Sequence, residues 1–170
     1  MRKITIAIVL GIILPLTGGY LYFNNQNSPQ NYLPKEQRKN VEAYFTENMR
    51  VSPSEAKEMA SKGVDLRVSK DTTLTGIVGN LYYYGFIDNE KAFTKLLETS
   101  IDTTSGRQGA IKIGNNSIDT NSSYYLNYQM TEKEIAETLL NKGRYSDKFN
   151  DYTYLFMPSG PEGSSRRPGR

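Results

Sequence analysis

The stretch Leu66–Phe93, LRVSKDTTLTGIVGNLYYYGFIDNEKAF, contains the strongest structural signals in this chain. Apolar and polar residues alternate over 64–69, as they do in a strand with one buried face. Asp71–Thr73 supplies suitable helix N-caps, and the apolar positions that follow repeat at helical spacing. Gly85 is placed to end this helix, and Asp88 is placed to cap a second one. The predicted order is therefore strand, helix, short turn and helix.

A second copy of the pattern follows further along the chain. The segment 122–128 alternates as a strand, and Thr131 and Glu134 fit the capping box of an amphipathic helix. Short apolar runs at 110–113 and 151–157 add two strand candidates. This arrangement predicts an α+β fold of small strand-helix-helix units on a short sheet.

Two charged helices are predicted before this domain. The first begins at Pro34, and Ser52 and Glu55 form the capping box of the second, which Gly63 ends. With the Asn- and Gln-rich stretch that precedes them, they are interpreted as a spacer and helical stalk over residues 24–63.

An uncharged segment at residues 4–23 reads ITIAIVLGIILPLTGGYLYF. A helix of this length spans the hydrocarbon layer of a bilayer, which is about 30 Å thick. Because Arg2 and Lys3 precede the segment, we expect a single-pass membrane anchor with a cytoplasmic N-terminus and an extracytoplasmic C-terminal domain. The alternative is a cleavable signal peptide with its cleavage region at 15–19.

These patterns divide the chain into four parts: a membrane anchor at 1–23, a spacer and stalk at 24–63, an α+β domain at 64–157 and a disordered tail at 158–170. The net charge of +3 resides at the two ends, and the stretch between them has 16 basic and 17 acidic residues. Nucleic-acid-binding domains concentrate basic residues on the folded body, so no nucleic-acid partner is predicted.

The absence of Cys and His limits the chemistry of the chain. It excludes disulfides, thiol nucleophiles, Cys-based metal centres and His-dependent triads. Oxygen ligands for Ca²⁺ occur in one polar region but lack EF-hand spacing, so loop solvation is expected instead. These residues are Asp102, Asn115, Asn116, Asp119 and Asn121. No metal site and no cofactor are predicted.

The order and spacing of two stretches resemble the LysM-like N-terminal region of the YceG-like endolytic murein transglycosylases. They are the stretch quoted above and SSYYLNYQMTEKEIAETLLNKG at 122–143. In that family a membrane anchor leads to a strand, a hydroxylated helix cap and a helix that ends in a Gly-hydrophobic-Ile step, here 85–87. The resemblance covers less than half of the chain and departs at Ser69–Asp71, where the family usually has glycines and prolines. It implies a LysM-like fold and a cell-wall ligand. The catalytic glutamate of the family has no counterpart here, so no catalytic residue is implied.

Thirteen tyrosines are many for 170 residues, and two clusters of them are candidates for a ligand surface. A tyrosine offers an apolar ring and a polar tip, which suit a sugar ring or a protein partner. Tyr82 continues the buried face of its helix, and packing is the alternative for each of the others. The predicted glycan or partner surface consists of Tyr83, Tyr84, Tyr124, Tyr125 and Tyr128.

Glycan cleavage would need a carboxylic acid of raised pKa near the scissile bond, often with a second carboxylate. Glu134 with Glu137 and Glu55 with Glu58 are spaced to share helix faces. Lys133 adjoins the first pair and Lys57 lies within the second, and both pairs lie opposite the apolar stripe of their helix, so they indicate solvated helix surfaces.

The resulting expectation is a membrane-anchored extracytoplasmic module that binds cell-wall glycan (peptidoglycan), or positions a wall-synthesis partner, without catalysis. One alternative is a protein-interaction scaffold of an envelope complex. Another is a divergent small glycan-cleaving enzyme with Glu134 or Glu55 as its acid.

Overall fold

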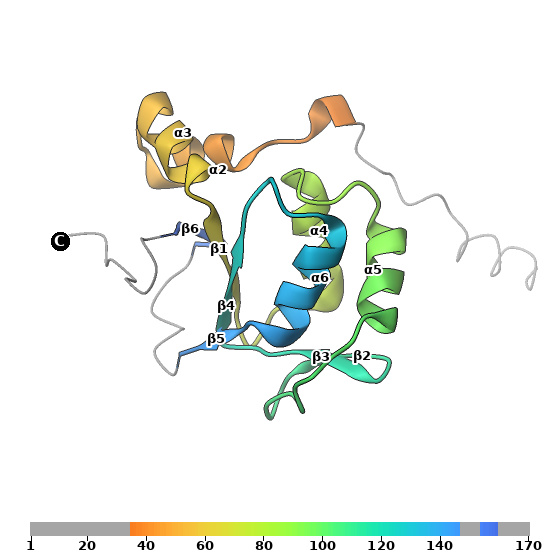
Figure 1. The fold of residues 1–170 in the computed structure, drawn as a ribbon. Coiled ribbons are helices and arrows are strands. Elements are labelled where there is room, and N and C mark those ends of the chain that lie inside the picture. The colour runs from red at the N-terminus through yellow and green to blue at the C-terminus, as the bar shows by residue number, and fades with distance from the viewer. Residues whose placement is uncertain (1–34, 147–153, 160–170) are drawn as a thin grey trace, which may run out of the picture. The chain divides into compact units, whose positions relative to one another are not determined.

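A computed structural model describes residues 35–146 and 154–159 of the chain (Figure 1). The expected anchor at 4–23 and most of the predicted tail lie outside the described residues. Within them, no helix has both the length and the apolar character needed to cross a membrane.

The predicted α+β class is confirmed by a four-stranded antiparallel sheet in the order β5-β4-β1-β6, with helices beside it. In the centre, β1 (Val64–Val68) pairs with β4 (Ser122–Leu126) on one side and with β6 (Phe156–Pro158) on the other. Leu66 is therefore opposite both Tyr124 and Phe156. The fourth strand, β5 (Arg144–Tyr145), is short and pairs only with the first two residues of β4.

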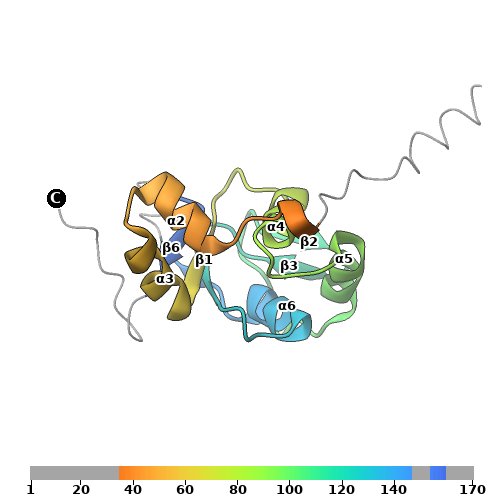
Figure 2. The same ribbon diagram turned by 90° about the horizontal axis from the view of Figure 1, so that it is seen from above.

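Three helices, α4 (Leu74–Tyr83), α5 (Glu90–Thr99) and α6 (Glu132–Asn141), lie together on one side of this sheet (Figures 1 and 2). The caps of two of them are as predicted: Thr73 begins α4, and Thr131 with Glu134 forms the capping box of α6. Gly85 ends the α4 segment at a φ of 77°. The buried faces of these helices and the inward residues of β1 and β4 form the core.

The predicted cap of α5 is wrong by one residue. The side chain of Asn89, not that of Asp88, accepts the Ala92 N–H at 2.9 Å. Arg38 holds the Asp88 carboxylate instead, with Nη1 at 3.3 Å from Oδ1. The Asp88 N–H donates to Glu132 at 2.6 Å. The carboxylate and the backbone N–H of Asp88 therefore both contact residues distant in the sequence.

The N-terminal helices pack into the same body. The helical stretch expected from Pro34 consists of a 3-10 turn, η1 (Lys35–Gln37), and then α2 (Val41–Met49), because the Asn40 side chain caps a new helix. The capping box of α3 (Pro53–Ser61) is as predicted. Val41, Tyr44 and Phe45 are buried, and the Tyr44 hydroxyl accepts the Leu155 N–H at 2.6 Å. Helix α2 is thereby joined to the segment that leads into β6.

A β-hairpin lies at the end of the domain away from α2 and α3 (Figure 1). It consists of β2 (Ile111–Ile113) and β3 (Asn116–Ile118). The first strand was predicted and the second was not, since its sequence has the composition of a turn. Ile113 and Ile118 are buried, so the hairpin closes that end of the core.

Candidate functional site

The structure places the five tyrosines of the predicted surface in three different settings. Tyr124 is 1% exposed, and its hydroxyl donates to the Asp119 carbonyl at 2.8 Å. Its ring lies against Gly143, where an added Cβ would be 2.9 Å from the hydroxyl oxygen. Burial raises the pKa of Tyr124 well above its usual value. Tyr124 is therefore a core residue, which corrects its assignment to a binding surface.

Tyr83, Tyr84 and Tyr128 gather where α4 ends. The rings of Tyr83 and Tyr84 meet edge to face, with centroids 4.9 Å apart, and both residues are half-buried. The Tyr128 ring stacks on Phe86 at 4.6 Å, and its hydroxyl donates to the Tyr84 carbonyl at 2.9 Å. The same hydroxyl accepts the Val41 N–H at 2.8 Å. This group therefore connects α2 to the end of α4, and 46% of Tyr128 stays exposed.

Tyr125 lies apart from the others, on the outer side of the sheet. It is 39% exposed, and its hydroxyl donates to the Lys62 carbonyl at 3.2 Å and accepts from Asn127 Nδ2 at 3.3 Å. The ring covers Gly63, where an added Cβ would be 2.5 Å from a ring carbon. Glycine is needed at this position both for the close approach and for the left-handed φ of 83°.

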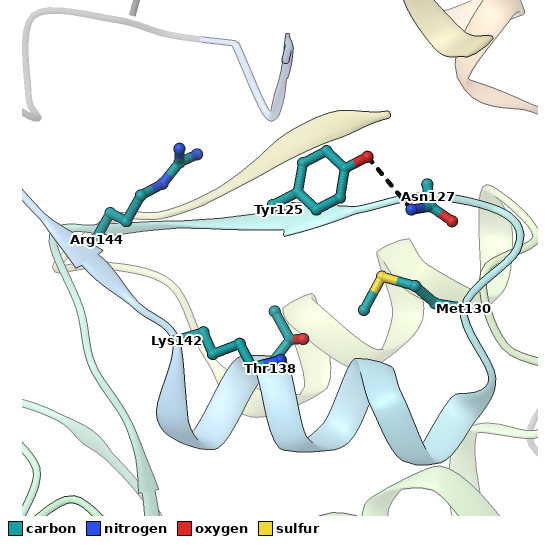
Figure 3. A pocket seen from close by; sticks show the side chains of 6 residues that line it. All are labelled: Tyr125, Asn127, Met130, Thr138, Lys142 and Arg144. Carbon is teal, nitrogen blue, oxygen red and sulfur yellow. Dashed lines mark hydrogen bonds between the residues drawn. The ribbon is translucent and has the colours of Figure 1, made fainter. Parts of the chain in front are cut away.

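An open groove of about 410 Å³ lies beside Tyr125, between β4 and α6 (Figure 3). Tyr125 and Asn127 contribute from the strand side, Met130 from the β4–α6 connection, and Thr138 from the helix. Lys142 and Arg144 lie at the other end, where α6 leads into β5. We refer to this feature, lined by these six residues, as the β4–α6 groove.

The charge of the β4–α6 groove is positive. Two of its six lining residues are basic and none is acidic. Arg144 forms an ion pair with Asp65 of β1, and burial raises the pKa of that carboxyl although the guanidinium opposes the shift. Lys142 is exposed and forms no ion pair with another residue in the described ranges. The charge of Lys142 also helps to lower the pKa of Glu134, but Lys142 is the cation of the groove lining that forms no ion pair with a described residue, so the groove can attract a carboxylate through it.

The two glutamates considered as acids are engaged in helix caps. Glu134 accepts from the N–H and hydroxyl of Thr131 at 2.7 and 2.9 Å. Glu55 accepts in the same way from Ser52 at 2.9 and 2.7 Å. These hydrogen bonds lower the pKa of both carboxyls. A general acid needs a shift in the opposite direction.

The polar residues considered as calcium ligands organise the loop before the hairpin. Asp102 accepts the N–H of Thr104 at 2.8 Å and that of Ser117 at 2.9 Å. Asn116 donates to the Leu97 carbonyl at 2.7 Å. No group of three or more acidic side chains within 35–146 and 154–159 is placed to hold a metal ion.

Of the six residues that line the β4–α6 groove, only Tyr125 was predicted from the sequence. Lys142 caps the end of α6, and Arg144 is the first residue of β5, a strand too short to recognise. Two basic residues beside a glycine at a helix end were the available signal. No family model, curated protein or solved structure shows a significant match to the chain.

Proposed function

We propose that this chain is a membrane-anchored module that binds peptidoglycan on the outer side of the membrane without cleaving it. The observation that carries the proposal is the β4–α6 groove, which is lined by an exposed aromatic ring, an amide and two basic residues. Residues 4–23 serve as the anchor, and the α+β domain is extracytoplasmic.

The side chains of the groove suit a ligand that combines sugar rings with carboxylates. The Tyr125 ring offers an apolar face, and the Asn127 amide lies beside its hydroxyl. Lys142 and Arg144 add donors for negatively charged oxygens. Peptidoglycan carries amino sugars and peptide stems with free carboxylates, so it offers a partner to each group. A neutral polysaccharide would leave Lys142 without an anionic partner, since Arg144 is already paired with Asp65.

The resemblance to the LysM-like region of the YceG-like transglycosylases supports the same ligand class. That region follows a membrane anchor in its family, and the uncharged segment 4–23 stands in the corresponding place here. We therefore propose kinship with that family's binding region, together with the cell-wall location that it implies.

Binding without cleavage is favoured by the state of the acidic residues. Glu134 and Glu55 are exposed, and their caps lower the pKa of each carboxyl. Asp65 has a raised pKa, but its carboxylate is paired with Arg144. Glycoside hydrolysis normally uses two carboxyl groups about 5–10 Å apart, one on each side of the scissile bond. The β4–α6 groove contains no carboxyl group.

Sedimentation with purified, insoluble peptidoglycan tests the proposal. The detergent-solubilised full chain should pellet with the cell-wall material, and Lys142→Glu should reduce the bound fraction several-fold. Lys91→Glu is the matched control, because Lys91 is an exposed cation on α5 that does not line the groove. Retention no greater than on cellulose particles would overturn the proposal.

The same preparation distinguishes the scaffold alternative. Ile101 is 77% exposed and Tyr145 is 47% exposed, so apolar surface outside the groove is open to a protein. A scaffold should give one dominant partner in chemical crosslinking followed by mass spectrometry, and it should show no retention on peptidoglycan.

A further inference from the structure

The outer edge of β4 is only partly covered. The register places Tyr145 opposite Ser122 and Arg144 opposite Ser123, and the pairing with β5 ends there. Continuing this register would put Lys142 opposite Tyr125, but Lys142 is the C-cap residue of α6, and its N–H donates to Thr138 inside the helix. The strand edge at Tyr125 therefore has no neighbouring strand within the described part of the chain.

Hydrogen bonds at both sides of the sheet show which way the Tyr125 backbone points. Along an antiparallel strand, the N–H and C=O of successive residues point to alternate sides. The Asn121 carbonyl accepts the Ser146 N–H at 2.9 Å, so the odd-numbered residues of β4 point toward β5. In β1, the Arg67 N–H donates to the Leu155 carbonyl at 2.9 Å, so the odd-numbered residues of β1 bond toward β6. The even-numbered residues of β1 therefore bond with the even-numbered residues of β4. Both observations direct the N–H and C=O of Tyr125 into the β4–α6 groove.

The direction of β5 also sets the direction of any peptide that would hydrogen-bond to the N–H and C=O of Tyr125. A peptide that lies antiparallel to β4 in line with β5 runs in the same direction as β5. Its C-terminal end then points at Arg144, where β5 begins, and Lys142 lies beside it (Figure 3). A short peptide that ends here would bring its terminal carboxylate toward Lys142, the cation of the groove that forms no ion pair with a described residue, while the Arg144 guanidinium is paired with Asp65.

We infer that the β4–α6 groove binds the peptide stem of peptidoglycan, extended along the edge of β4, with its C-terminal carboxylate at Lys142. This inference rests on the proposed function and specifies which part of the polymer is recognised. One ligand residue pairs with the N–H and C=O of Tyr125, as in β-strand addition. The glycan strand is then held only through its attached stems.

Two forms of peptidoglycan separate the inference from the proposed function. Intact material and the glycan strands left after an amidase has removed the stems are each coupled to beads, because the strands are soluble once the cross-linking stems are gone. The full chain should pellet with the first and lose at least about tenfold in affinity for the second, because a hydrogen bond to a charged group is lost with each stem. Equal retention on both materials would overturn the inference while the proposed function stood. Retention on neither would overturn both.

A soluble probe examines the carboxylate directly. The probe is N-acetylated lysyl-D-alanyl-D-alanine, used as the free acid and as the C-terminal amide. The amide should bind at least about tenfold more weakly, and Lys142→Gln should remove most of this difference. Lys91→Gln, outside the groove, should leave it unchanged. Equal affinities for acid and amide would contradict the inference.

Backbone pairing has its own readout. Amide hydrogen exchange measured by NMR should show the Tyr125 N–H exchanging fast in the free chain and slowing when the acid probe is added. The Leu126 N–H, which points toward β1, should not change. Tyr125→Pro removes the backbone N–H, whereas Tyr125→Val keeps it, and both variants lack the aromatic ring. Only the proline variant should therefore lose affinity for the free-acid probe. If the free-acid probe binds without protecting Tyr125, the strand-addition geometry is wrong.

Discussion

Removing the Tyr128 hydroxyl should lower the free energy of unfolding by about 2 kcal/mol. The substitution Tyr128→Phe keeps the ring that stacks on Phe86. It deletes the oxygen that accepts the Val41 N–H at 2.8 Å and donates to the Tyr84 carbonyl at 2.9 Å. The effect therefore isolates two hydrogen bonds between α2, the end of α4 and the loop before α6.

The magnitude comes mainly from Val41. This residue is 0% exposed and opens α2, so its N–H has no helical partner and would be left without an acceptor. A buried donor left unpaired costs about 1–3 kcal/mol. The Tyr84 carbonyl belongs to a half-buried residue and can accept a hydrogen bond from water instead, so losing its bond to Tyr128 adds little to the cost.

Urea unfolding of the full chain, followed by far-ultraviolet circular dichroism, measures this loss. Tyr145→Phe is the control, because Tyr145 is 47% exposed and its hydroxyl has no hydrogen bond to another residue in the described ranges. The control should change stability by less than about 0.5 kcal/mol. If Tyr128→Phe changes it no more than the control does, the bridging role assigned to the hydroxyl is wrong.

The same variant has a signature at alkaline pH. Burial raises the pKa of Tyr128 from 10.0 to about 12, so the unfolded chain ionises this phenol before the folded chain does. Its contribution is fully present below pH 10 and is lost as the pH rises toward 12. Stability should therefore fall less steeply over this range in Tyr128→Phe than in the wild type. Identical slopes would contradict the assignment.

Three further substitutions test local features of the fold, each by urea unfolding. Gly63→Ala places a Cβ 2.5 Å from the Tyr125 ring at a φ of 83°, and should cost about 2 kcal/mol or more. Thr131→Ala removes the cap of α6 and should cost about 1 kcal/mol at pH 7. Because the cap lowers the pKa of Glu134 below 4.5, the contribution of that carboxylate is present above this pH and is lost as the pH falls below it. Asn116→Ala leaves two carbonyls at the end of α5 without a donor and should cost about 1–3 kcal/mol.

Matched controls accompany these three variants. Gly114→Ala meets no atom within 4 Å and should cost less than the change at Gly63. Thr131→Ser keeps the capping oxygen and should retain most of the stability. Asn115→Ala alters an exposed turn residue next to Asn116 and should have little effect. If any control matches its test variant, the contact named for that variant does not carry the stability assigned to it.

The parts of the fold that were predicted correctly are specified by contacts within a few residues. The two capping boxes join a hydroxyl to a glutamate three positions later, and both are present. The positive φ values of Gly63 and Gly85 likewise reflect local backbone geometry. Such signals can be read from the sequence because no distant segment is needed to form them.

The errors arose where a distant segment decides the outcome. Asp88 and Asn89 are equally good caps, and Arg38, far away in the sequence, engages the first of them. Strands β3 and β5 are short and polar, so only their partners identify them.

The candidate site shows the same limit. Alternation along β4 put Tyr124 and Tyr125 on opposite faces, but only packing shows that Tyr124 faces the core. The groove depends on the place where β5 leaves β4, and no pattern in the sequence records that point.

The position of β1 has a consequence for how the protein is made. Its neighbours β4 and β6 come later in the chain, and Leu66 meets Phe156 only after the intervening segment has been synthesised. Pairings between segments so far apart in the sequence form slowly, because the entropy cost of closing a long loop comes before any stabilising contact is made. If the segments that follow the anchor cross the membrane in the order in which they are made, β1 emerges early with both edges unpaired. An uncovered apolar strand invites pairing with other chains, so we expect the emerging chain to depend on protection until its last strand arrives.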